Sequence, residues 1–443
     1  MPETLTAAAG TTGWLDTALA ELAAFASPGR PGWTREVFST PYRESRRWVR
    51  DQMRLAGLEV HQDAAGNLIG RLPGILPSIP PLVTGSHTDT VDGGGRFDGV
   101  VGVLGALAAV RLLRESGTRL ARDLLVVDFL GEESNPFGLS CLGSRALAGE
   151  LTREDLARTD YQGRTLAAAY TDFGLDPSAL LSGAAWTGAR RPHAYVELHV
   201  EQGPVLEARG IPVGIVTAIT GIERLVASFT GTPDHAGTRP MDDRRDAMVA
   251  AAEAVLAIRA EGCGAPEHGV ATVTRLENAS ASPNVVPALV RLYGEVRSVD
   301  ETWLHGTRRR LAEEIAAKAA EHDVEVELGW STDNTVVRAT TGVQDLAAAA
   351  ADAAGVPWLP IPSGATHDAV HMASLAPMGM IFIPSVNGKS HCPEEFTATE
   401  HITTGVQVLA DTLLRLDSHS FPARSQSTRP HSARPHPVRR NHP

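Results

Sequence analysis

Two short apolar runs that end in polar residues constrain the fold most strongly. They are PPLVTGSH (80–87) and DLLVVDFLGEE (123–133), and residues 99–116 between them have the length and apolar content of a helix. Continuous apolar runs of this length are typical of strands buried on both faces of a parallel sheet, and parallel neighbours need a crossover connection. We therefore predict a β-α-β unit with polar clusters at the carboxyl ends of its strands.

Further elements extend this unit on both sides. Residues 43–56 have the pattern of an amphipathic helix, and residues 58–74 that of a hairpin with polar residues and glycine at its turn. Near the end of the chain, MGMIFIP (378–384) is predicted to be a buried strand and residues 404–417 a closing helix. The body of the protein is therefore predicted to be an α/β domain with a mixed, mainly parallel sheet flanked by helices.

The middle of the chain follows a different pattern. Residues 214–332 give strand, strand, helix, strand, strand, helix, strand, which is enough for an independent sandwich of one sheet and two helices. We predict that this segment is an inserted domain. The body is then discontinuous, with residues 1–213 and 333–421. Residues 422–443 are rich in Pro, Arg, Ser and His, and we expect a disordered tail whose purpose the sequence does not give.

Composition sets limits on partners and compartment. The 443 residues carry a formal charge of −12. Because the last 22 contain five arginines and no acid, the rest of the chain is more acidic still, and nucleic acid is not an expected partner. No apolar run approaches the length of a membrane span, and no secretory signal is recognisable, so we expect a cytoplasmic protein with no membrane partner. Three cysteines without CxxC spacing argue against a disulfide framework or a thiolate zinc site.

The first chemical cluster follows the strand that ends at residue 87. His87 stands at the strand end, and Asp98 comes after a glycine-rich loop, so an imidazole and a carboxylate could share one cation. Asp89 is placed to accept a hydrogen bond from the other ring nitrogen of His87. A strand-end histidine capped by a loop aspartate would fit this segment equally well. Gly99, Gly102 and the glycine three residues later lack the spacing of a dinucleotide site and indicate close helix–sheet packing.

The second cluster is the pair Glu132 and Glu133, directly after the other strand. Adjacent carboxylates at a buried strand end repel each other, and a cation beside one of them removes that cost. One glutamate can then bind metal while its neighbour accepts a proton from water as general base. A solvated loop pair is the alternative.

Two further histidines complete the set. His199 lies in ELHVEQGP and His391 in PSVNGKSHCPEEFT, each near the end of a predicted strand. Either one alone fits a structural role. Together, four strand ends present three imidazoles and two carboxylates, which gives each of two cations two or three protein ligands if Asp98 bridges them. Such ligands, without thiolate, suit Zn, Mn, Co or Ni.

With these motifs in view, the chain resembles the metal-dependent M20 peptidase-like hydrolases. ELHVEQGPVLE, GTPDHAGTRPMDDRRDA and GATHDAVHMA are similar to its hydantoinase/carbamoylase branch, which includes N-carbamoyl-L-amino acid hydrolase, β-ureidopropionase and allantoate amidohydrolase. The resemblance covers about residues 35 to 417. It implies two divalent metal ions per subunit, a ferredoxin-like inserted domain that acts as lid and dimerisation module, and a homodimer.

The resemblance also implies a role for each site residue. His87 and His199 would hold one metal, Glu133 and His391 the other, with Asp98 bridging and Glu132 as the base. His235 resembles the residue that reaches the neighbouring active site and polarises the scissile carbonyl. Asn284 and Arg297 resemble the pair that grips the substrate carboxylate, and Gln202 and His367 match further substrate contacts.

We expect hydrolysis of the carbamoyl C–N bond of an N-carbamoyl-L-amino acid to the amino acid, ammonia and carbon dioxide. The alternatives are allantoate or β-ureidopropionate as substrate, an N-acyl amino acid deacylase or dipeptidase, and a binding protein without catalysis. The chain departs from its relatives at residues 134–137 (Ser-Asn-Pro-Phe), Thr366 and Cys392. These residues are expected to line or adjoin the pocket and so to affect which substrate fits.

Overall fold

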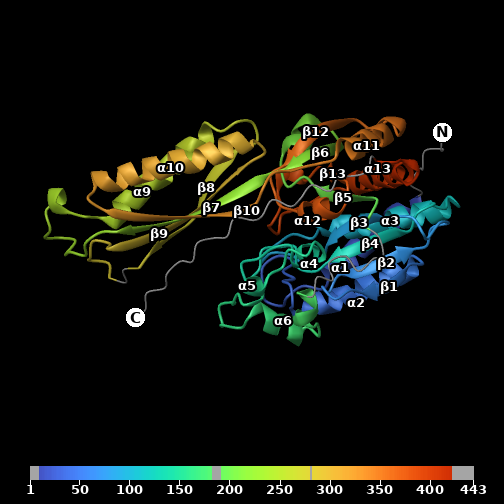
Figure 1. Ribbon diagram of the computed structural model, residues 1–443, viewed down its shortest axis with the longest axis horizontal. Helices are drawn as coiled ribbons and strands as arrows, with labels where there is room; N and C mark the ends of the chain where they lie inside the picture. The colour runs from blue at the N-terminus through green and yellow to red at the C-terminus, as the bar shows by residue number, and fades with distance from the viewer. Residues whose placement is uncertain (1–8, 182–190, 280–281, 422–443) are drawn as a thin grey trace.

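The computed structural model describes residues 9–181, 191–279 and 282–421, and their strands form two separate sheets (Figure 1). The larger sheet has nine strands and lies in the part of the molecule that contains both ends of the described chain. The smaller sheet has four strands. The predicted disordered tail, 422–443, lies outside the described residues.

The strand order of the larger sheet is β1-β2-β4-β3-β5-β13-β6-β11, with β12 also paired to β6. Four central strands, β4, β3, β5 and β13, are mutually parallel, whereas β1, β2, β6 and β11 add antiparallel pairs. The sheet is therefore mixed, as predicted. Its strands are β1 (Glu59–Gln62), β2 (Leu68–Leu72), β3 (Leu82–His87), β4 (Leu124–Phe129), β5 (Ala194–Val200), β6 (Val213–Ile219), β11 (Val337–Arg338), β12 (Trp358–Ser363) and β13 (Met378–Ile383).

Helices cover both faces of this sheet and create two apolar cores. Successive strand residues point to opposite faces, so Leu82 packs into one core and Val83 into the other. On the first face lie α1 (Ala9–Ala23), α2 (Thr40–Leu55), α3 (Val100–Glu115), α11 (Thr341–Ala353) and α13 (Thr399–Ser418). The second face is covered by α12 (Ala369–Leu375), which packs against β5, β13 and α4 (Leu142–Leu147).

Short helices occupy the connections. An aromatic and aliphatic cluster around Tyr42 and Phe137 packs the segment between β4 and β5 against the body. The helices of these connections are α5 (Arg153–Leu156), α6 (Leu166–Asp172), α7 (Pro177–Leu180) and α8 (Val205–Arg209), together with the 3-10 turns Met241–Asp243 and Val386–Gly388.

The smaller sheet is antiparallel, in the order β10-β7-β9-β8. Its chain order is β7-α9-β8-β9-α10-β10, the ferredoxin-like arrangement, and both helices lie on one face of the sheet (Figure 1). Its elements are β7 (Gly221–Thr230), α9 (Ala247–Cys263), β8 (Val270–Asn278), β9 (Leu289–Ser298), α10 (Glu301–Glu321) and β10 (Glu325–Asn334).

One strand belongs to a different sheet from the one predicted. Residues 214–219 were predicted to belong to the inserted segment, but β6 pairs with β11, β12 and β13 in the larger sheet. The small sheet therefore begins at Gly221, and the chain returns to the large sheet after Asn334. The remaining strands and helices of the inserted segment, the β-α-β unit and the 58–74 hairpin match their predicted positions.

Candidate metal centre and active site

Four strand ends meet at one edge of the large sheet. His87 is the last residue of β3, Glu132 and Glu133 follow β4, His199 is the penultimate residue of β5, and His391 follows β13. Because β4, β3, β5 and β13 are parallel neighbours, their carboxyl ends lie side by side. The topology thus brings together residues that are up to 304 positions apart in the printed sequence.

Asp98 lies at the centre of this cluster. Its Oδ1 is 3.2 Å from His199 Nε2 and 3.7 Å from His87 Nε2, whereas its Oδ2 is 3.3 Å from His391 Nε2. Glu133 Oε2 lies 3.4 Å from the same nitrogen of His391. Two ligand groups result, one of His87, Asp98 and His199 and one of Asp98, Glu133 and His391, each with its donor atoms within 4.8 Å of one another.

The donor chemistry fits two divalent cations that share Asp98. Each group offers imidazole nitrogen and carboxylate oxygen, the two oxygens of Asp98 face different groups, and all members except His391 are buried. Burial raises the pKa of Glu133 to about 7, with the Asp98 charge adding to the effect. Burial opposes the protonated form of His391, but Glu133 and Asp98 outweigh it and raise its pKa to about 9. A proton on Glu133 or His391 offsets the negative charge of the buried carboxylates, and a bound cation would neutralise the same charge.

Contacts behind the ligands fix their orientation. The Nδ1 atom of His199 lies 2.9 Å from the carbonyl of Val200, and that of His87 lies 3.2 Å from the carbonyl of Asp89. The Asp89 carboxylate is also near, at 3.5 Å. Its two oxygens accept hydrogen bonds from the backbone N–H groups of Glu132 (3.2 Å) and Glu133 (3.1 Å). Asp89 thus connects the β3 end with the β4 end, a role beyond its predicted position beside His87.

Close packing at the start of α3 explains the glycines there. Gly99 has φ +65°, and a Cβ on it would fall 2.3 Å from the His87 ring. A Cβ on Gly102 would lie 2.5 Å from the carbonyl of Leu198. The predicted role of these glycines in helix–sheet packing is confirmed.

Glu132 lies within the cluster but outside both ligand groups. It is buried, and its Oε2 is 3.5 Å from His87 Nε2. Burial raises its pKa well above the ordinary value; the His87 charge opposes this, and the Glu133 charge adds to it. A carboxylate with a raised pKa is a stronger base than an ordinary one.

Gln202 and His367, predicted to contact substrate, both lie at the cluster. Gln202 Nε2 donates to Asp98 Oδ2 at 2.6 Å. The His367 ring centroid is 4.5 Å from that of His199, and its Nε2 lies 2.8 Å from Ser363 Oγ. Burial and the charge of His199 lower the pKa of His367 well below its ordinary value, so this imidazole is neutral.

The structure separates Arg297 from Asn284 and His235, the other two site residues predicted in the inserted segment. Arg297, near the end of β9 closest to the large sheet, donates to the carbonyl of Gly364 at 3.1 Å and to Glu295 at 2.8 Å. Asn284 precedes the opposite end of β9, and Ala236 N, beside His235, donates to the Asn284 carbonyl at 2.9 Å. At about 3.3 Å per residue, the eight steps from Leu289 to Arg297 span about 26 Å. Within one chain, Arg297 and Asn284 therefore do not meet at one ligand.

Two buried acids beside the cluster were missed. Glu395 Oε1 accepts from the backbone N–H groups of Phe97 (2.7 Å) and Asp98 (3.0 Å), and its Oε2 accepts from Ser390 Oγ at 2.8 Å. Glu197 accepts hydrogen bonds from the hydroxyls of Ser86 and Tyr195 and belongs to a third group of possible metal donors with His199 and His367. Glu395 lies in the SHCPEEFT motif, and Glu197 shares a strand face with His199, which are the signals available in the sequence.

Two of the places where the chain departs from the family pattern, residues 134–137 and Thr366, make structural contacts. The amide of Asn135 donates to the carbonyl of Leu139 at 2.6 Å and accepts from Phe137 N at 3.0 Å, so it closes its own loop. Phe137 is buried in a core cluster. Thr366 Oγ1 donates to Asn334 Oδ1 at 2.9 Å, which connects the loop before His367 to the crossing between the two sheets.

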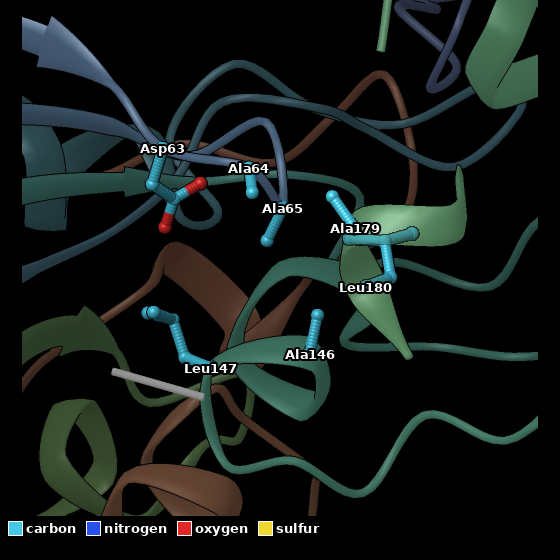
Figure 2. Close-up of a pocket in the computed structure, with 7 residues that line it drawn as sticks. All are labelled: Asp63, Ala64, Ala65, Ala146, Leu147, Ala179 and Leu180. Carbon is cyan, nitrogen blue, oxygen red and sulfur yellow. The ribbon is translucent and has the colours of Figure 1, made fainter. Parts of the chain in front are cut away.

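A small pocket elsewhere in the body is distinct from this cluster. Figure 2 shows that Asp63 is its acidic member and that the other lining side chains are apolar. Both carboxylate oxygens of Asp63 already accept hydrogen bonds from Asn67. The pocket therefore offers little polar chemistry to a ligand.

Among the helices of the described residues, none combines the length and apolar character of a membrane span.

Comparison with known proteins identifies the family. The model of peptidase family M20/M25/M40 matches residues 83–415. The N-carbamoyl-L-amino acid amidohydrolase of Geobacillus stearothermophilus is 38% identical over 392 residues, which are 87% of this chain and 93% of that protein. The ureidoglycolate hydrolase of Arabidopsis thaliana is 37% identical over 404 residues, 89% of this chain and 84% of that protein.

Solved structures agree. The crystal structure of AtUAH in complex with (S)-hydroxyglycine has a TM-score of 0.83 at 34% identity, and covers 94% of this chain and 99% of its own. A hydantoinase/carbamoylase family amidase from Burkholderia multivorans has a TM-score of 0.82 at 32% identity, with 93% and 98% covered.

The fold and the cluster define a hydrolase of carbon–nitrogen bonds, and the chain belongs to peptidase family M20/M25/M40. Its similarity to amidohydrolases of the hydantoinase/carbamoylase group confirms the predicted family and enzyme class. The chain is an amidohydrolase. The predicted α/β fold is confirmed as well.

Proposed function

We propose that this protein hydrolyses the carbamoyl C–N bond of an N-carbamoyl-L-amino acid, with two divalent metal ions held by His87, His199, Asp98, Glu133 and His391. The carrying observation is that Asp98 places one oxygen toward each of two ligand groups, with the Glu132 carboxylate 3.5 Å from His87 of the first group. Divalent cations at such a cluster acidify water and polarise a carbonyl.

Each residue then has a definite task. Glu132 accepts a proton from the attacking water and delivers it to the leaving nitrogen, since its raised pKa suits both steps. The neutral His367 offers a hydrogen bond without adding charge to the cluster. Gln202, which holds Asp98 through its amide nitrogen, keeps its oxygen available to a substrate N–H.

The substrate carboxylate requires a positive group, and Arg297 supplies it. Because Arg297 and Asn284 lie at opposite ends of β9 in one chain, and Asn284 lies beside His235, we propose that Asn284 and His235 reach a given site from a second subunit, whereas Arg297 belongs to the subunit that holds the metal ligands. This arrangement makes a homodimer the active form. Cross-complementation tests it, because mixing inactive R297A and inactive H235A proteins should restore part of the turnover in mixed dimers.

Ureidoglycolate is the second candidate substrate, because the Arabidopsis relative that is named for this hydrolysis is 37% identical over most of both chains. It is also a ureido compound with a carboxylate, as are allantoate and β-ureidopropionate. N-acyl amino acids remain the alternative for the same cluster.

A substrate panel tests the assignment. Metal-loaded enzyme (Zn, Mn, Co or Ni) is assayed for ammonia release from N-carbamoyl-L-amino acids, ureidoglycolate, allantoate and β-ureidopropionate. N-acetyl amino acids and dipeptides are followed by amino acid release. We expect the highest kcat/KM for an N-carbamoyl-L-amino acid. Absence of ammonia from every ureido compound would refute the proposal.

The role of Glu132 has its own test. E132Q should reduce kcat by about 10²-fold or more, because a neutral amide cannot accept the proton, while bound metal measured by elemental analysis stays close to the wild-type content. E133Q is the matched comparison, since it alters the adjacent carboxylate and should lower metal content. Wild-type turnover in E132Q would exclude it as the base.

A further inference from the structure

We propose that Cys141 is a positioning residue that holds the carboxylate of Glu132 through a thiol hydrogen bond; this inference rests on the proposed role of Glu132 as the base. Cys141 Sγ lies 3.6 Å from Glu132 Oε1, a contact within the range of sulfur hydrogen bonds. Neither the family resemblance nor the metal-ligand groups include this residue.

The backbone places the thiol beside the base. The N–H groups of Cys141, Leu142 and Gly143 donate to the carbonyls of Glu132 (2.8 Å), Gly131 (2.9 Å) and Leu130 (2.7 Å). Three successive bonds thus fix the register of the two segments. Cys141 itself adopts φ +55° at the N-terminus of α4, a left-handed conformation that is uncommon for a residue with a side chain.

The two carboxylate oxygens of Glu132 have different neighbours. Oε1 faces the Cys141 thiol, whereas Oε2 lies 3.5 Å from His87 Nε2, on the side of the ligand groups. Within residues 9–181, 191–279 and 282–421, no second side chain donates a hydrogen bond to this carboxylate. A donor on Oε1 limits rotation of the group and leaves Oε2 directed toward the water that it must deprotonate.

The thiol remains a donor at working pH. Cys141 is fully buried, and burial together with the Glu132 charge raises its pKa well above the ordinary value. A protonated thiol is a weak donor, so it can orient the carboxylate without reducing its basicity as much as a stronger donor would.

Kinetics test the role against the best ureido substrate of the panel. C141A should lower kcat about tenfold with KM nearly unchanged, the effect of one hydrogen bond to a charged group. C141S should stay within about threefold of wild type, since a hydroxyl also donates. In the E132Q background, C141A should change the remaining turnover less than about twofold, because the two residues act as a unit. C263S removes an exposed cysteine far along the chain and serves as the control.

A purely structural role predicts different results. C141A and C141S would then lose activity equally, or the loss in C141A would add to that of E132Q, and either result would overturn the proposal. Wild-type kcat in C141A would do so as well. If E132Q keeps full turnover, the proposed function fails instead, and the contact is decided by a measurement that needs no turnover.

That measurement is the S–H stretching band of Cys141 in the infrared. The difference between wild type and C141S isolates the band, because serine has no S–H bond. We expect a lower frequency than for a free thiol, and a shift toward the free value when E132Q replaces the charged acceptor by a weaker neutral one. An identical band in wild-type and E132Q backgrounds would overturn the proposal whatever the substrate.

Discussion

Removal of the Glu395 side chain should weaken both the metal centre and the fold. In E395A, the N–H groups of Phe97 and Asp98 lose their shared acceptor, which lies 2.7 and 3.0 Å away, and Ser390 loses one of its two carboxylate partners but keeps Asp98. Each buried group left unsatisfied costs about 1–3 kcal/mol, so a loss of about 3 kcal/mol in unfolding free energy is expected for the two N–H groups. Glu395 is 2% exposed, so water does not replace it readily.

The metal centre should respond because Asp98 depends on the same carboxylate. Loss of an orienting partner behind a ligand typically weakens metal binding by about 10- to 100-fold, and E395A should fall in this range. E395Q should be milder, since its amide oxygen can keep the two backbone bonds while its NH₂ group faces Ser390. Competition with a chromophoric chelator measures the affinity, and urea unfolding of the metal-free protein measures stability.

A matched control lies next to it in the sequence. Glu394 carries the same charge, but its side chain is 64% exposed and lies 3.9 Å from Lys389. E394A should therefore change neither metal affinity nor stability appreciably. Equal losses in E394A and E395A would show that charge alone is responsible, and wild-type affinity in E395A would refute the argument that Glu395 holds Asp98.

Two further predictions concern protons and buried charge. Metal affinity should rise at least about tenfold per pH unit between pH 7 and 9, because His391, with its pKa of about 9, must release a proton. Burial opposes the protonated form of the ligand His87, but Glu132 and Asp89 outweigh it and raise the pKa of this ligand as well. The rise should be steeper below pH 7, where Glu133, with its pKa of about 7, must release another proton. A chelator titration that finds no pH dependence would contradict this. R46M should cost about 3–5 kcal/mol in urea unfolding, because Arg46, 3.7 Å from Asp128 and equally buried, would leave that carboxylate unpaired. R224M removes a half-exposed cation and should cost at most about 1 kcal/mol, so equal losses would argue against the buried pair.

The candidate metal ligands were predictable because a general rule connects sequence with space. Polar residues that follow buried parallel strands meet at one edge of the sheet, so His87, Glu133, His199 and His391 were expected together without any knowledge of the strand order. The loop that returns Asp98 to them was expected from its glycines. The structure adds that Gly99, directly after Asp98, leaves no room for a side chain because it contacts the His87 ring.

Contacts between segments that lie far apart in the sequence could not be predicted. The apolar run at residues 213–219 marks a strand, but its periodicity does not tell which sheet it joins, and its partners β12 and β13 come more than 130 residues later. The same holds for Glu395, which in the sequence is one of two adjacent acids. Burial of one and exposure of the other follow only from the approach of the 93–98 loop.

The buried acids around the centre follow one physical arrangement. Asp89 and Glu395 belong to neither of the two ligand groups that share Asp98. Each nevertheless accepts hydrogen bonds from two backbone N–H groups at the centre. Asp89 accepts those of Glu132 and Glu133, and Glu395 accepts those of Phe97 and Asp98. Asp89 thereby holds Glu132 and Glu133 against the end of β3, and Glu395 holds Asp98 against the loop of His391. Backbone donors stabilise these charges without supplying protons to the centre. Repelling carboxylates are therefore kept close together before any cation binds, so binding energy is not used to assemble the site.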